Sequence, residues 1–596
     1  MTRELLCTVA LVAFAGGARE VAAQADTTAR DTTARQDTTT RGDSVARDTT
    51  AAYLPVFAAS RPAGPLPAGT RYSFTADSFA LSSIQTLSDL LGRIPGVYVA
   101  RGGIYGQAEI VFYGGRGAAG LEIYWDGVPF VPLGRDSVFL DPARISLAPL
   151  ERVDVVVLPA TLRVYLVTAR QQSTVPATQI RIATGEVNTR SYRGYYAKRW
   201  RSGLGLSLLA DYNNTDGIAR SSSTTFNSVD FWLNGEWVPS PRFGVSYQML
   251  SSSWKRNESD ASVTDQFDYR RRDGILRAFA VGRGDGLGPR AEFTFATTTA
   301  ERDLPGSPRS LSQTMLALSN AWERAHCGIT LRAQNDQRPW QVEAAAAWRP
   351  LGPLTLAADA RQARYDGSRR GEHAHLAAGL ALPLGFSVHG DAAWAKDLQA
   401  PTLATDTAQE TMDVSAALRW QRPRAMIEVG GGRRDPYTPL GRAAGLKPID
   451  GLTPTPRTRY VTGQAALQPL PGLHLAGWYF HPLHASGGDF EPPQNARVSM
   501  TFYSKFWRVY RSGIFALRGE VAMESWSRGT AGRDSAGSLL ALPGATFIEF
   551  NVEVQVAGVT IYWVQRNVNR MRESYVPGLD YPTHFQFYGV RWLFTN

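Results

Sequence analysis

Residues 548–556 have the sequence Ile-Glu-Phe-Asn-Val-Glu-Val-Gln-Val, in which apolar and polar side chains alternate without a break. Successive side chains of a β-strand point to opposite faces, so this segment predicts a strand with one apolar and one polar face. Residues 229–237 and 340–348 have the same period of two. At roughly 3.3 Å per residue and a tilt of roughly 40°, residues 340–348 would rise about 20 Å, close to the ~25 Å apolar band of membrane β-barrels.

The composition of this 596-residue chain fits such a barrel better than a helical membrane protein. Hydrophobic residues make up 43% and charged residues 19% of the chain, and the mean hydropathy is −0.22. The 15 Trp, 23 Tyr and 25 Phe residues would suit the two membrane–water interfaces, where amphipathic rings gather. A large soluble β-propeller or sandwich is also rich in aromatic residues, and composition alone does not separate these folds.

Turn signals divide residues 178–596 into about 20 to 22 strands of a predicted transmembrane antiparallel β-barrel. Short Pro/Gly turns at 239–241, 350–353, 383–385, 422–424 and 469–472 alternate with longer polar segments at 257–266, 302–312 and 398–409. Short turns at one end and long loops at the other are typical of outer-membrane barrels. The sheet must close on itself, because unpaired backbone groups are too costly in hydrocarbon.

The first 75 residues are expected to contain a targeting signal and a linker. Residues 1–25 have the Arg3 start, the short apolar stretch and the small-residue cleavage site of a secretory signal peptide. Residues 26–75 form a degenerate Asp-Thr-Thr repeat and a Pro-rich linker, predicted to be disordered because large apolar residues are scarce. Cys327 would then be the one cysteine of the mature chain, so no intramolecular disulfide is expected.

Residues 76–171 predict a small α/β domain. Apolar residues recur at helical spacing within 82–92, with Ser82 or Ser83 as the cap and Pro95 beyond the end. The apolar runs at 97–99, 109–113, 121–125 and 150–158 predict strands. Asp126-Gly127 is a hairpin turn signal, because glycine tolerates a positive φ.

Four motifs of this domain resemble the plug of TonB-dependent outer-membrane receptors. They are Leu90-Leu91-Gly92-Arg93-Ile94-Pro95-Gly96-Val97, Gly115-Arg116-Gly117, Tyr124-Trp125-Asp126-Gly127-Val128-Pro129 and Leu150-Glu151-Arg152-Val153-Asp154-Val155. The resemblance implies a plug inside a 22-stranded barrel of the bacterial outer membrane. Its motif residues are interpreted as structural, in turns and charge pairs: Pro95, Gly96, Arg116, Gly117, Asp126, Gly127, Glu151 and Arg152. Leu158-Pro159 departs from the family's Gly-Pro and Gly-rich turn, which puts the plug's last strand within 161–170 in question.

Two further segments have counterparts in the family. Receptors of this kind present a short segment ahead of the plug to the energy-transducing protein TonB, and our candidate is Tyr53-Leu54-Pro55-Val56-Phe57. A short strand or a plain linker is the alternative interpretation. Near the C-terminus, one face of a strand is formed by Tyr588, Val590, Trp592 and Phe594. This strand resembles the closing strand that the barrel-assembly machinery recognises.

The sequence predicts neither an enzyme nor a cofactor site. It contains no Gly-x-Ser-x-Gly elbow, Walker loop or dinucleotide fingerprint. His373 and His375 would share one face of a strand, but Cys or carboxylate ligands are not at supporting spacing, so solvent-exposed loop histidines are the expectation. The net charge of +10 is spread over strand-like segments, which favours lumen or anionic-lipid contacts over nucleic acid.

These features favour a receptor that imports a ligand by energised displacement of its plug. The expected partners are outer-membrane lipid, the periplasmic domain of TonB, the barrel-assembly machinery and a small-molecule or oligomeric nutrient. A plugged barrel that acts as an adhesin or structural protein is the alternative, which the atypical region 158–170 favours. An outer-membrane hydrolase is the third hypothesis. The loop sequences do not identify the ligand.

Overall fold

The computed structural model describes residues 52–57, 66–79, 83–102, 109–133, 139–216, 226–256, 267–284, 286–302, 309–335, 340–365, 369–401, 406–440, 451–483, 488–506, 509–510, 512, 514–577, 581 and 585–595. The predicted signal peptide 1–25 and the Asp-Thr-Thr repeat lie outside these residues. Within the described ranges, no helix is long and apolar enough to cross a membrane.

The N-terminal domain is built on a five-stranded sheet with the order β1-β6-β7-β4-β5. Its strands are β1 (Arg71–Thr75), β4 (Leu121–Trp125), β5 (Val128–Pro129), β6 (Leu150–Val157) and β7 (Leu162–Thr168). Strand β4 runs parallel to β7, and the other pairs are antiparallel. A second sheet pairs β2 (Tyr98–Arg101) with β3 (Glu109–Phe112). The helical elements are α2 (Ala76–Phe79), α3 (Leu87–Leu91), η1 (Gly117–Gly120) and η2 (Pro142–Arg144).

Three details differ from the sequence expectations. Strand β1 joins the sheet ahead of residue 76, because its backbone pairs with β6 although its own side chains are largely polar. Helix α3 is shorter than 82–92, and Asp89 accepts hydrogen bonds from the N–H groups of Gln85 and Thr86 just before it. Strand β7 is a regular central strand despite the unusual Leu158-Pro159. Its apolar side chains complete the domain core, and Leu162, Val164 and Leu166 are fully buried.

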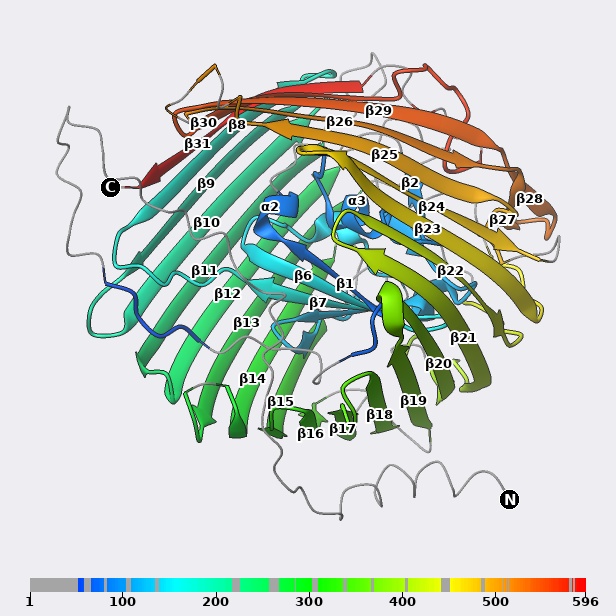
Figure 1. Ribbon diagram of the computed structural model, residues 1–596, viewed down its shortest axis with the longest axis horizontal. Helices are drawn as coiled ribbons and strands as arrows, with labels where there is room; N and C mark the ends of the chain where they lie inside the picture. The colour runs from blue at the N-terminus through cyan, green and yellow to red at the C-terminus, as the bar shows by residue number, and fades with distance from the viewer. Residues whose placement is uncertain are drawn as a thin grey trace. The chain divides into compact units, whose positions relative to one another are not determined.

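Among the described residues, twenty-two strands form one closed antiparallel barrel, which confirms the predicted fold class. In chain order the barrel strands are β8 (Ala177–Gly185), β9 (Arg190–Arg199), β10 (Leu204–Thr215), β11 (Phe226–Ser240), β12 (Phe243–Arg256), β13 (Phe267–Val281), β14 (Gly288–Arg302), β15 (Arg309–Ala321), β16 (Ala325–Gln334), β17 (Trp340–Trp348), β18 (Leu354–Arg364), β19 (Arg370–Ala381), β20 (Phe386–Asp397), β21 (Gln409–Arg422), β22 (Ala425–Arg434), β23 (Thr458–Leu470), β24 (Leu473–Pro482), β25 (Asn495–Ser504), β26 (Phe515–Trp526), β29 (Ala545–Val556), β30 (Val559–Arg566) and β31 (Phe585–Thr595). Helix η3 (Pro383–Gly385) turns between β19 and β20, and β27 (Gly529–Arg533) pairs with β28 (Leu539–Leu542) in a loop hairpin. In Figure 1 the wall strands surround the blue and cyan elements of the N-terminal domain.

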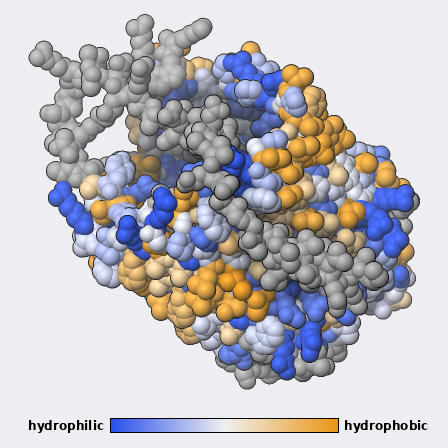
Figure 2. Space-filling view, turned by 60° about the horizontal axis from the view of Figure 1, so that its bottom comes forward, coloured by the Kyte–Doolittle hydropathy of each residue, from blue (hydrophilic) through white to orange (hydrophobic). Residues whose placement is uncertain are grey.

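The barrel closes where β31 pairs with β8. Tyr588, Val590 and Trp592 of β31 are exposed on the outer face, as are Ile180 and Ile182 beside them on β8. Apolar residues cover broad orange areas of the surface in Figure 2. The outer wall is therefore apolar, while the inner wall carries polar side chains that meet the N-terminal domain.

The closing seam gives a direct test of this lipid-facing surface. Val590 lies at the middle of β31 and pairs with Ile182, so Val590→Arg would place a charge in hydrocarbon. We expect a loss of about 2–4 kcal/mol in the free energy of unfolding, measured by urea titration in phospholipid vesicles. The matched control is Gln179→Arg on the inner face of β8, which should be tolerated. Equal losses in both variants would contradict the assigned faces.

Candidate functional site

The N-terminal domain fills the lumen of the barrel. Its apolar core continues into the wall, since Trp125 and Val128 belong to one buried cluster with Trp232, Ile275 and Met315 of the wall strands. The Trp125 indole N–H also donates to Gln248 of β12 at 3.2 Å. The contact between domain and wall is thus part of the folded core, and the cavities left within it are the candidate sites.

The larger cavity measures about 240 Å³ and lies between the domain and the wall from β15 to β21. Its domain side includes apolar residues of 129–133 and 139–140, and its wall side includes residues 397–401, at the end with the longer loops. Charged side chains of both parts line it: Arg116, Glu122, Arg332, Arg361, Asp397 and Asp413. This mixture can hold an amphipathic ligand by apolar contact and by charge.

A network of ion pairs fastens the domain to the wall beside this cavity. Arg163 of β7 lies 3.2 Å from Glu122 of β4 and 2.8 Å from Asp359 of β18. Arg361 of β18 lies 3.0 Å from Glu122 and 3.1 Å from Asp397 of β20. Burial raises the pKa of Glu122, but Arg361 and Arg163 outweigh it and hold this pKa below its ordinary value. Glu122 therefore stays ionised, and we call these five residues the plug junction.

Arg116 is the sequence-predicted residue that meets the larger cavity with a free donor. Its Nη2 pairs with Asp413 of β21, and its guanidinium lies 4.6 Å from the centre of the Tyr437 ring. Within the described part of the chain, the buried Nη1 has no hydrogen-bond partner. A buried donor left unpaired is costly, so this atom is a point at which a ligand acceptor would be stabilised.

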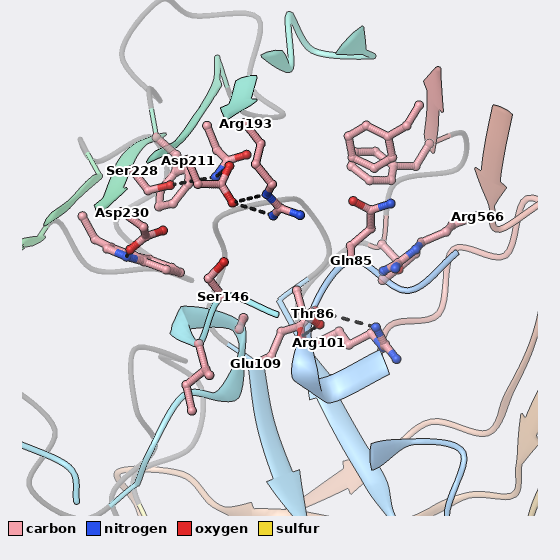
Figure 3. A pocket seen from close by; sticks show the side chains of 18 residues that line it. Gln85, Thr86, Arg101, Glu109, Ser146, Arg193, Asp211, Ser228, Asp230 and Arg566 are labelled. Carbon is pink, nitrogen blue, oxygen red and sulfur yellow. Dashed lines mark hydrogen bonds and ion pairs between the residues drawn. The ribbon is translucent and has the colours of Figure 1, made fainter. Parts of the chain in front are cut away.

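A smaller cavity of about 60 Å³ lies on another side of the domain, between residues 85–146 and strands β9 to β12, β30 and β31. Figure 3 shows Thr86, Arg101 and Glu109 of the domain facing Arg193, Asp211 and Asp230 of the wall. Thr86 Oγ1 donates to Glu109 at 3.0 Å, and Arg193 Nε donates to Asp211 at 2.9 Å. The charges that line this cavity are thus already paired by their own neighbours.

Of the other motif residues, Gly117 also lines the larger cavity, and several contact neighbouring parts of the domain or the wall. Gly96 has a φ of +77° and packs so closely on Phe480 of β24 that a Cβ atom would collide with the ring. Asp126 accepts hydrogen bonds from Thr168 Oγ1 and Gln248 Nε2, each at 2.7 Å, which ties the Asp126-Gly127 turn to the wall. Pro95 lies beside Gly96 in the same connection after α3.

Glu151 and Arg152 have different partners, both inside the domain. Glu151 accepts from Arg170 Nε at 3.1 Å, and Arg152 Nε donates to Asp154 at 2.9 Å. Asp154 is fully buried and has a second basic partner in Arg71 at 2.8 Å. These two motif residues therefore stabilise the domain and do not line the larger cavity.

The candidate partner-binding segment 53–57 is docked at the opposite end of the barrel, where β9 ends. The Leu54 N–H donates to the Gln172 carbonyl at 2.9 Å, and Arg199 Nη2 donates to the Pro55 carbonyl at 2.8 Å. Phe57 is buried against Phe279 of β13, with ring centroids 4.7 Å apart. Tyr53 is 78% exposed. The segment is thus held at both ends: the Tyr53 backbone forms an antiparallel bridge with Ser173 although its side chain is exposed, Phe57 is buried, and Val56 lies between them.

Sequence reasoning missed most of the plug junction. The sequence feature that could have pointed to the plug junction is Arg163, a charged residue inside a mostly apolar strand. His373 and His375 do share the inner face of β19, but the expectation of solvent-exposed loop histidines was wrong. His375 is buried and contacts Asp359 at 2.9 Å and Asp391 at 3.2 Å. In the described part of the chain, no group of three or more His, Cys, Asp or Glu side chains is placed to hold a metal ion.

Comparison with known proteins agrees with this geometry. Residues 67–164 match the family model of the TonB-dependent receptor plug domain.

The siderophore receptor PirA from Acinetobacter baumannii is 11% identical, with a TM-score of 0.67 over 88% of this chain and 98% of that one. The copper transporter OprC is 11% identical, with a TM-score of 0.70 over 88% and 100%. The FrpB iron transporter from Neisseria meningitidis is 10% identical, with a TM-score of 0.69 over 89% and 100%. No curated protein sequence matches the chain. At these identities the structures show a shared fold.

The plug junction gives a first prediction for this interface. Arg163→Met leaves Glu122 and Asp359 short of a buried partner, which typically costs about 3–5 kcal/mol. We expect a loosened plug and cells that become more sensitive to vancomycin, which an intact outer membrane excludes. Arg152→Met is the matched control, because its ion pair lies wholly within the domain. Equal sensitivity of the two variants would argue against a fastening role for the junction.

Asp141, ahead of η2, gives a prediction for pH. Burial raises the pKa of its carboxyl from 3.8 to about 6, although Arg144 acts in the opposite direction. The folded domain therefore holds this proton more tightly than the unfolded chain, and domain stability should fall as pH rises from about 4 to about 6. Asp141→Asn should remove this dependence. Thermal unfolding of both forms across that range measures it, and identical slopes would refute the assignment.

Proposed function

We propose that this TonB-dependent receptor of the bacterial outer membrane imports a ligand by energised displacement of its plug. The observation that carries the proposal is the arrangement of the plug, with a cavity at the loop end and an anchored, extended segment at the opposite end. A ligand bound at the loop side and a partner that pulls from the periplasmic side would then both act on the plug. The mechanism has no chemical step, and binding is followed by conformational release.

Ligand would bind in the larger cavity between plug and wall. Arg116 Nη1 offers a buried donor there, and apolar residues of 129–133 offer contact area. Passage through the barrel requires the plug junction to break, since Arg163 and Arg361 link plug and wall on that side. The similar structures are described as a siderophore receptor, a copper transporter and an iron transporter, so metal ions and metal chelates are the first probes to screen.

The periplasmic domain of TonB is the proposed partner of residues 53–57. An extended segment can add a strand to another sheet through its backbone groups. In the structure those groups are held partly by Gln172, Arg199 and Arg170, the last of which donates to the Phe57 carbonyl at 3.2 Å. Partner binding therefore competes with docking on the receptor itself.

The outward-facing residues of β31, where the barrel closes, are the proposed signal for barrel assembly. Tyr588, Val590 and Trp592 project from β31 toward lipid, and Phe594 follows in the same register. A free strand of this pattern is the form in which the barrel-assembly machinery would receive the chain before β31 pairs with β8.

A plugged barrel that does not transport is the second candidate. The observation in its favour is an aromatic cluster that joins the plug to the loop end, where Tyr98 contacts Trp526 and Tyr575. The Tyr98 hydroxyl also donates to the Tyr575 carbonyl at 2.9 Å. Such a cluster would suit a rigid surface protein, and it must open if the chain transports.

Leu54→Pro separates the two candidates. The variant removes the Leu54 N–H that pairs with Gln172, and a proline cannot donate to an added strand. We expect folding and membrane insertion to persist, binding of the purified TonB periplasmic domain to fall at least about tenfold, and uptake of the screened metal chelates to cease. Tyr53→Ala is the control and should retain binding. Unchanged uptake in Leu54→Pro would contradict energised import through this segment.

A further inference from the structure

Three turns at the periplasmic end of the barrel, all in the sector from β17 to β24, each present a leucine. The turns join β17 to β18, β19 to β20 and β23 to β24, and their leucines are 61%, 71% and 62% exposed: Leu351, Leu384 and Leu470. Three other hairpins of this rim have an exposed arginine at the turn. These are Arg201, Arg242 and Arg324, in the hairpins β9/β10, β11/β12 and β15/β16. Three of the four turns from β17 to β24 therefore expose a leucine, and we call these three the leucine turns.

The conformation of Leu384 makes this exposure costly. Its backbone is left-handed, with φ 61° and ψ 19°, a region that glycine or asparagine enters with less strain. A leucine at this position combines backbone strain with apolar surface in water. An apolar partner outside the chain would remove the cost of the exposed apolar surface.

The leucine turns are rigid, so their tips are not folded back onto the barrel. A Cβ atom on Gly385 would collide with the Gln421 carbonyl of the next hairpin. The Gly472 carbonyl accepts a hydrogen bond from the Tyr503 N–H at 2.7 Å. The turns of Leu384 and Leu470 are thus packed by their backbones against a neighbouring strand, while both leucine side chains are exposed.

Two of the wall strands above these turns, β18 and β19, have a short apolar outer face. Asp359 and His373 face the plug, so residues of even number face outward on β18 and β19. The apolar outward positions run from 354 to 360 and from 374 to 380, and Gln362 and Glu372 then follow. Six steps of roughly 3.3 Å at a tilt of roughly 40° give about 15 Å, against an apolar band of about 25 Å.

We propose that the leucine turns are inserted into the inner leaflet of the outer membrane, with phospholipid acyl chains as their partner. The apolar outer wall continues without a break into the tips, since Leu380, Leu382, Leu384, Phe386 and Val388 are all exposed. Arg422 and Arg424 are exposed on the β21/β22 turn inside this sector and suit the phosphate groups at its edge. The barrel thereby sits deeper in the membrane along β17 to β24 than along β9 to β16. This inference rests on the outer-membrane location and not on transport.

Spin labels measure this depth directly. In a Cys327→Ser background, single cysteines at Leu351, Leu384 and Leu470 would carry a nitroxide in vesicles of phosphatidylethanolamine and phosphatidylglycerol. Matched labels replace Arg242 and Arg324 on the polar tips. We expect the leucine turns to collide several-fold more with dissolved oxygen than with a soluble nickel chelate, and the arginine tips to show the reverse. Equal access of the nickel chelate to all five positions would overturn the proposal.

A second measurement separates lipid from a protein partner. Leu384→Asn relieves the backbone strain, so its unfolding midpoint in urea should be unchanged or higher in detergent micelles and lower in the same vesicles. Arg242→Asn should be neutral in both. Labels that become shielded from nickel in whole envelopes but not in pure vesicles would show a periplasmic protein as the occupant and would refute the lipid assignment. A midpoint of Leu384→Asn that is unaffected by vesicles would do the same.

Discussion

In the hydrocarbon of a membrane, every backbone N–H and C=O group needs a partner within the protein. This requirement explains the antiparallel ladder of twenty-two strands and its closure through β31 and β8. It also explains the alternation of side chains, because a strand in a closed wall has one face toward lipid and one toward the lumen. The plug, the cavities and the ion pairs all depend on a lumen that this closure creates.

The lumen sets a second constraint, because charges inside it are withdrawn from water. The plug junction meets this constraint by sharing partners, so that Glu122 contacts Arg163 and Arg361 while Asp359 contacts Arg163 and His375. A buried ionic contact is a poor source of net stability compared with apolar packing. It does, however, fix one arrangement of the two surfaces and can be exchanged for contacts with water. That combination is compatible with the plug displacement proposed above.

The wall could be predicted from sequence because its pattern is local. Residues 548–556 alternate along the chain, and β29 covers them as one strand. The plug motifs also lie close together in sequence, and apolar residues of 90–97 and 150–155 belong to one buried cluster. The plug junction could not be found in this way, since Arg163 and Asp359 are 196 positions apart and no local period links them. The docking of Phe57 on Phe279 was hidden for the same reason, because the two residues are distant in sequence.

The most direct test of this account is the electrical conductance of the purified chain in planar lipid bilayers, compared with that of a variant lacking residues 1–171. The account predicts that the full chain is nearly closed to ions, and that the variant without its plug forms large, stable pores. A full chain that conducts as well as the truncated one would contradict a plug seated in a closed barrel. A folded, inserted truncation that does not conduct would contradict the open lumen on which the account depends.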